Sequence, residues 1–139
     1  MATFNKFQAF VEDVAEKVHN LGADTLKVML TLSAPVATNS VKADLTDIAA
    51  GNGYTAGGTQ ATISTSAQTT GTYKLVLADV VFTATGGAIA DFRYAVLYNS
   101  SSASSSLIGY WDYGSTVTLS SGETFTVDFD VATGVLQIT

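Results

Sequence analysis

The chain has 139 residues and a mass of 14.4 kDa, and 47% of the residues are hydrophobic, enough for one domain with a buried core. It contains no cysteine, which excludes disulfides, thiolate metal sites and cysteine nucleophiles. Its formal charge of −6 argues against a basic nucleic-acid-binding face. Only 13% of the residues are charged, against about 25% in ordinary soluble domains. This composition is typical of β-rich proteins that work in assemblies or outside cells.

An amphipathic helix is predicted over residues 1–22. Its apolar residues recur in steps of three and four, with Thr3 as the N-cap and Gly22 as the stop. Two interpretations stay open: the helix packs on its own sheet, or it also packs on a partner subunit. His19, the only histidine, is near the last turn and is expected to be structural or solvent-exposed. The apolar stripe is Phe4, Phe7, Phe10, Val11, Val14, Val18 and Leu21.

Neither a secretion signal nor a membrane span is recognisable. The first apolar residues are interleaved with charged ones such as Lys6 and Glu12. The longest uncharged apolar run, near residues 80–82, is far too short to cross a bilayer. We therefore expect a soluble protein made in the cytoplasm.

After residue 24 the period of the apolar residues changes to two, which predicts β-strands. The short spacing of the strands and their small turns predict an antiparallel β-sandwich or jelly-roll-like domain of about eight or nine strands over residues 25–139. Residues 36–59 are expected to be irregular, with a short helical turn at 45–50 and a glycine-rich loop at 51–58. The predicted strands are 25–32, 61–66, 72–77, 80–84, 88–98, 107–113, 116–119, 124–130 and 135–139.

No catalytic or metal-binding pattern is recognisable, so we expect neither an enzyme nor a cofactor. A single histidine and no nucleophile motif argue against hydrolytic triads. Residues 51–58 lack the Gly-Lys-Ser/Thr ending of a phosphate loop. Asp128 and Asp130 are expected to be solvated charges on one strand face. A calcium site there is the alternative, although the usual calcium-loop signature is missing.

Aromatic residues gather in the two strands that flank the serine-rich run 99–106. Tyr110 and Trp111 should face opposite ways, so one of them is expected to be exposed or in an interface. The possible roles of these aromatics are core packing, a subunit interface or a platform that stacks on sugar rings. The serine run is expected to be a flexible loop, or a loop that orders against a neighbouring subunit. The candidate interface residues are Phe4, Phe7, Phe10, Val11, Tyr54, Tyr110 and Trp111.

Five segments carry a resemblance to a known family. They read FNKFQAFVEDVAEKVHNLGADTLKVML, DLTDIAAGNGYTAGG, FRYAVLYN, IGYWDYG and SGETFTVDFDVATGVLQIT, in chain order. With these segments the chain resembles small virion structural proteins of tailed bacteriophages, which decorate or cement the capsid. The resemblance implies a β-sandwich or jelly-roll domain that forms a homotrimer over junctions between capsomers.

The expected function is that of a non-enzymatic decoration or cement protein on the outer surface of a phage head. Its partner would be the major capsid protein, whose subunit contacts it would stabilise. We expect no nucleic-acid or membrane partner, and a location on the capsid exterior after synthesis in the host cytoplasm. The alternative is a receptor- or carbohydrate-binding module on a tail or fibre.

Overall fold

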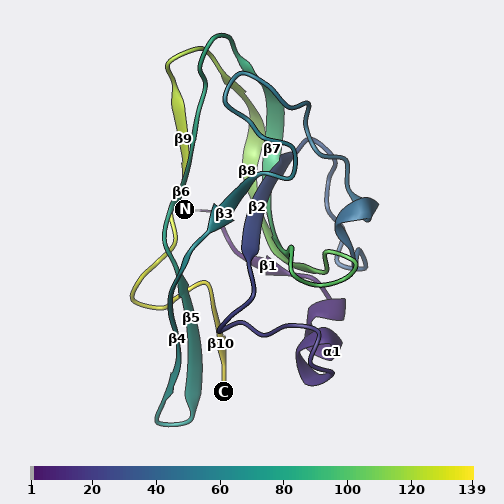
Figure 1. Cartoon of the computed structure of the whole chain (residues 1–139), viewed down its shortest axis with the longest axis vertical. Coiled ribbons are helices and arrows are strands. Elements are labelled where there is room, and N and C mark those ends of the chain that lie inside the picture. The colour runs from purple at the N-terminus through teal and green to yellow at the C-terminus, as the bar shows by residue number, and fades with distance from the viewer. Residues whose placement is uncertain (1) are drawn as a thin grey trace.

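A computed structural model describes residues 2–139; residue 1 of the predicted helix is outside the described residues. The described chain forms antiparallel sheets from ten strands, with one short α-helix, which confirms a mainly β, sandwich-like fold (Figure 1). The elements in chain order are β1 (Asn5–Lys6), α1 (Ala9–Ala15), β2 (Leu26–Thr31), the 3-10 helix η1 (Lys42–Asp44), β3 (Thr59–Ala61), β4 (Ile63–Thr69), β5 (Thr72–Leu77), β6 (Val80–Thr83), β7 (Ile89–Asn99), β8 (Leu107–Leu119), β9 (Thr124–Val127) and β10 (Leu136–Ile138).

The central sheet has five strands in the order β1-β8-β7-β2-β3. On the left of this sheet in Figure 1 lie the three-stranded sheet β10-β5-β4 and the two-stranded sheet β6-β9. On its right lie α1, η1 and the loops around η1. Because other elements cover both faces of the central sheet, side chains on both of its faces can be buried.

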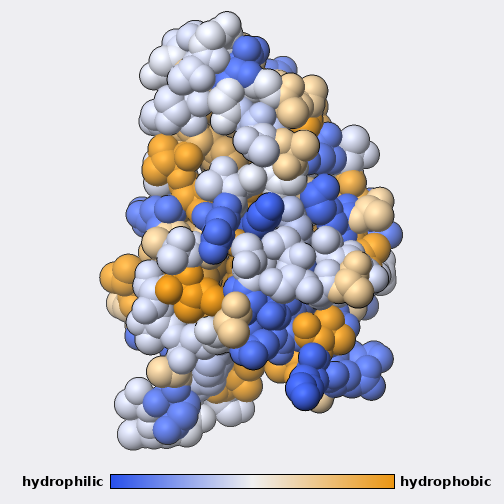
Figure 2. All heavy atoms as spheres, viewed as in Figure 1, coloured by the Kyte–Doolittle hydropathy of each residue, from blue (hydrophilic) through white to orange (hydrophobic). Residues whose placement is uncertain are grey.

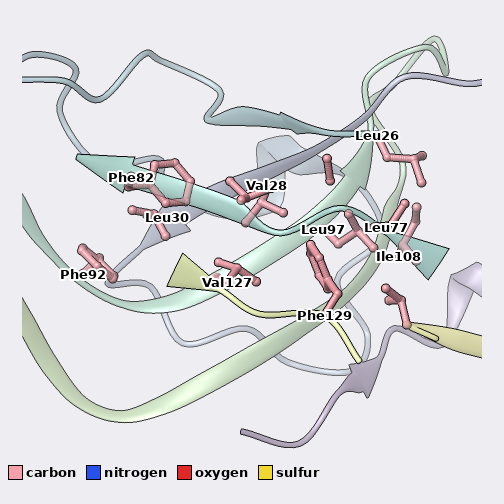
Figure 3. Packing of buried hydrophobic residues seen from close by; sticks show 14 of the residues in the cluster. Leu26, Val28, Leu30, Leu77, Phe82, Phe92, Leu97, Ile108, Val127 and Phe129 are labelled. Atoms are coloured by element: carbon pink, nitrogen blue, oxygen red, sulfur yellow. The ribbon is translucent and has the colours of Figure 1, made fainter. Parts of the chain in front are cut away.

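Two hydrophobic clusters follow from this arrangement. Leu26, Val28 and Leu30 of β2 point into the larger cluster, where Figure 3 shows Val28 and Leu30 near Phe82 of β6 and Val127 of β9. Met29, between them in the sequence, points the other way into a smaller cluster with Phe7 and Val96. A strand that is buried on both faces reads as a continuous apolar run, as Val28, Met29 and Leu30 of β2 do.

The N-terminal helix is much shorter than predicted. It covers Ala9–Ala15 and is preceded by Gln8, so Thr3 is not its N-cap and Gly22 is not its stop. Asn5 and Lys6 form strand β1, which pairs with Tyr110 and Gly109. An extended backbone sends Phe4 to Trp111 and the larger cluster, and Phe7 into the smaller one. Phe4 and Phe7 therefore pack on opposite faces of the central sheet, whereas a helix would have placed both on one apolar stripe.

Several strand bounds also differ from the predicted ones. The predicted strands 107–113 and 116–119 are one strand, β8, because a register shift takes up the residues between Asp112 and Val117 without ending the strand. The predicted strand 61–66 is divided between β3 and β4. The helical turn lies at Lys42–Asp44, where Asp44 accepts hydrogen bonds from the backbone N–H groups of Ser40 and Val41, rather than at residues 45–50.

Candidate functional site

The best-formed candidate site is a surface hollow of about 270 Å³ between strands β7, β8 and β9. The register of β7 and β8 places Trp111 directly opposite Ala95, whose small side chain leaves room beside the indole ring. The hollow is lined by Ala2, Arg93, Ala95, Trp111, Tyr113, Phe125, Thr126, Val127 and Asp128. We call this set of residues the aromatic hollow.

Neighbouring rings hold the aromatic side chains of the hollow in place. The Trp111 ring lies 5.2 Å from the ring of Phe4 and 5.5 Å from that of Phe129. The Phe125 ring makes an edge contact with Tyr113, at 5.7 Å between centroids. Trp111 is half-buried, whereas Tyr113 is 58% exposed. The hollow therefore offers supported aromatic surface to solvent.

Arg93, which lines the hollow, is held by an ion pair with Asp112, which does not line it. Arg93 Nε donates to Asp112 Oδ1 at 2.8 Å and Arg93 Nη2 donates to Asp112 Oδ2 at 3.0 Å, a two-pronged contact. This hydrogen bonding lowers the pKa of the Asp112 carboxyl and raises the pKa of Arg93. Because both side chains are well exposed, the pair orients the guanidinium more than it stabilises the fold.

Apolar rings beside an oriented arginine suit binding rather than bond-making chemistry. Tyr, Trp and Arg are the side chains that dominate the energy of protein interfaces. The same rings could also stack on the flat face of a sugar. Among residues 2–139 we find no cluster of three or more His, Asp or Glu side chains that could hold a metal ion. Asp130 instead caps a turn through the N–H of Ala132 and the hydroxyl of Thr133.

The structure divides the predicted interface residues into two groups. Phe7, Phe10 and Tyr54 are 0%, 5% and 3% exposed, so they belong to the interior of the chain and their assignment to an interface is corrected. Phe4, Tyr110 and Trp111 are half-buried, and Val11 is exposed on α1. Of the seven, only Trp111 lines the aromatic hollow.

Tyr110 and Trp111 do face opposite ways, as predicted. Tyr110 packs on Phe7 in the smaller cluster, and Trp111 packs on Phe4 beside the larger one. Both side chains are half-buried, and part of the Trp111 ring stays open to the aromatic hollow, so the expectation that one of them is exposed or in an interface stays a prediction. Sequence reasoning missed Arg93 as a site residue. An arginine between the aromatic residues Phe92 and Tyr94 was the signal that could have found it.

The serine-rich run is tied to its own chain by hydrogen bonds. Ser101 Oγ accepts from the N–H of Thr25, and Ser100 Oγ donates to the carbonyl of Thr25. Ser102 Oγ donates to the carbonyl of Asn99 and accepts from the N–H of Ser106. These bonds give the loop a defined conformation without a neighbouring subunit.

His19 lies beyond the end of α1 and is buried. The Asn99 amide nitrogen lies 3.0 Å from His19 Nδ1 and also donates to Asp24. Because an amide nitrogen only donates, Nδ1 accepts and the ring proton is on Nε2. The Nε2 atom lies 3.9 Å from Asp13, beyond hydrogen-bond distance. Burial lowers the pKa of His19, although the carboxylates of Asp13 and Asp24 oppose this shift.

We therefore expect the protein to lose stability as the pH falls from about 7 through the ordinary histidine range. The unfolded chain has an ordinary histidine pKa of about 6.5 and binds the proton more readily than the folded chain. This contribution is complete above that pKa and is lost as the pH falls through it. Urea unfolding at several pH values measures the change. His19→Gln should flatten the curve in this window, whereas an equal slope in both proteins would contradict the assignment. The lowered pKa values of Asp112 and Asp130 act below about pH 4 and do not interfere.

Comparison with models of protein families, with curated protein sequences and with solved structures found no match to this chain. Within residues 2–139, no helix is both long enough and apolar enough to cross a lipid bilayer.

Proposed function

We propose that the chain is a non-enzymatic structural protein of a phage virion that binds the outside of the capsid and stabilises contacts between major capsid protein subunits. The five sequence segments that resemble virion decoration proteins support the virion location. The single observation that supports attachment is the aromatic hollow. It gathers Trp111, Tyr113 and Arg93, the residue types that most often anchor protein interfaces, in one surface depression.

Attachment of this kind would stabilise a shell mechanically. Packaged DNA pushes outward, and a protein that bridges neighbouring subunits adds contacts that must break before the shell opens. The homotrimer implied by the resemblance would present three hollows at once, so that modest single contacts add up through avidity. The charge of −6 fits a position outside the shell, because nothing there has to neutralise DNA.

Binding to capsids that lack the protein tests the proposal. We expect Tyr113→Ser to weaken binding by about tenfold, since Tyr113 is the most exposed ring of the hollow. Val131→Ser is the matched control, because Val131 is 72% exposed but does not line the hollow. Equal capsid binding by the two variants would show that the hollow is not the surface that contacts the capsid. Failure to find the polypeptide in purified particles would contradict the virion location itself.

A second candidate function, a glycan-binding module on a tail or fibre, is favoured by the same half-exposed ring of Trp111 beside Arg93 and Asp128. Trp111 is the only tryptophan, so its fluorescence reports on the hollow alone. Quenching by soluble oligosaccharides would favour this function. Quenching by capsids but not by oligosaccharides would favour decoration.

A further inference from the structure

Strand β4 is the longest strand at a sheet edge in residues 2–139. It has seven residues and ends the order β10-β5-β4, and it forms the outer side of the hairpin at the lower end of Figure 1. The edge strands β1, β3 and β10 have only two or three residues each. An edge of this length presents a row of backbone groups to which another strand can bind.

The register shows which backbone groups of β4 face outward. Thr69 pairs with Thr72 across the two-residue turn Thr70-Gly71, and hydrogen-bonded pairs then alternate along the hairpin. Leu75 directs its carbonyl away from β4, where it accepts from the N–H of Val135. Ser66, opposite Leu75, therefore directs its own N–H and C=O to the open edge, and Gln68 does the same two residues on.

Charged residues and proline, two of the usual protections of an edge strand, are missing from β4. Soluble proteins place charges or proline on exposed edges to prevent pairing with other chains. No charged residue occurs between Asp47 and Lys74, and β4 holds no proline. This part of the surface, at the lower left of Figure 2, is mostly pale, without a strongly apolar patch. In a chain with a charge of −6, the uncharged edge is where two copies can approach without repulsion.

We propose that β4 pairs with β4 of a second copy, antiparallel and centred on Ala67. A register shift interrupts the strand between Ile63 and Thr65, which leaves Thr65–Thr69 as its regular part, with Ala67 in the middle. This register sets Ala67 opposite itself and Ser66 opposite Gln68, whose outward groups then bond to each other. Thr65 comes to lie opposite Thr69, a favourable cross-strand pair.

Such a contact has twofold symmetry and joins copies in pairs. It cannot close a ring of three, so it would be separate from the contact of the proposed homotrimer and would link one such trimer to the next. It does not rest on the proposed attachment to a capsid, and the experiment below uses the purified protein alone.

Single-cysteine variants test the pairing, because the chain has no cysteine of its own. In the proposed register the Cα atoms of the two Ala67 residues would be about 4.5 Å apart, within disulfide range. Under mild oxidation we expect Ala67→Cys to form disulfide-linked dimers about tenfold faster than Ala103→Cys, because pairing raises the local thiol concentration. Ala103 is the matched control, an exposed alanine in the serine-rich loop. Equal rates in the two variants would overturn the proposal.

Two further measurements check the register and the symmetry. A mixture of Thr65→Cys and Thr69→Cys should cross-link faster than either variant alone, since these residues lie opposite each other only between copies. In sedimentation over a range of concentrations, Ala67→Lys should weaken self-association about fivefold, because it places two like charges directly opposite. Ala103→Lys should leave it unchanged. Unaltered self-association in Ala67→Lys would contradict pairing through β4.

Discussion

Replacing Gly58 by alanine should lower the free energy of unfolding by about 4 kcal/mol or more, the largest effect we expect from a single residue. A Cβ atom at this position would collide with the Val28 carbonyl oxygen and lie 2.6 Å from its carbon and 2.7 Å from Met29 Cα. These are backbone atoms of β2, which is held in the sheet by β7 on one side and β3 on the other, so they cannot move aside. The backbone φ of +82° adds strain for any residue with a side chain.

Gly71→Ala is the matched control for this change. Gly71 has nearly the same φ, +84°, but a Cβ atom there meets nothing within 4 Å. It should cost only the conformational strain, about 1 kcal/mol. Urea unfolding of both variants measures the difference. Equal losses would mean that the backbone of β2 leaves room for a Cβ atom at Gly58.

The sequence predicted the strands better than it predicted the N-terminus, and the physical reason is visible in Phe4 and Phe7. Strands β2, β5 and β7 lie within one residue of their predicted bounds, because alternation and turn residues are local signals. The choice between helix and strand at residues 4–7 depends instead on β8, about a hundred residues away. A helical pattern was present, and long-range packing overrode it.

The aromatic hollow could be predicted only in part for a related reason. The concentration of Tyr110, Trp111 and Tyr113 in the sequence drew attention to β8. The hollow itself needs Arg93 and Phe125 beside that strand. The pairing of β7 with β8 brings Arg93 there, and the packing of β9 against the central sheet brings Phe125. Tyr54 shows the opposite case, an aromatic in a glycine-rich loop that suggested an exposed surface and lies in the core instead.

Tyr54→Ala should lower the free energy of unfolding by about 3–5 kcal/mol, the range for a large aromatic side chain lost from a core. The Tyr54 ring packs 5.8 Å from that of Phe82. Its hydroxyl accepts from the N–H of Leu30 at 3.0 Å and donates to Asp47 at 2.5 Å. Burial, and then the hydrogen bond to Asp47, raise the pKa of this hydroxyl, so it stays protonated as a donor.

Tyr54→Phe separates the hydroxyl from the ring. Strand β3 pairs with β2 only as far as Val28, and beyond that point the Tyr54 hydroxyl supplies the acceptor that a neighbouring strand would have given to Leu30. Its removal leaves a buried N–H without a partner, so we expect a loss of about 1–3 kcal/mol. Tyr113→Phe, at an exposed tyrosine, should change stability by less than about 0.5 kcal/mol. If Tyr54→Phe were as stable as Tyr113→Phe in urea unfolding, the Tyr54 hydroxyl would have no part in fixing the loop to β2, and the ring and the other hydrogen bonds of the loop, such as that from Ile48 N–H to the Leu30 carbonyl, would suffice.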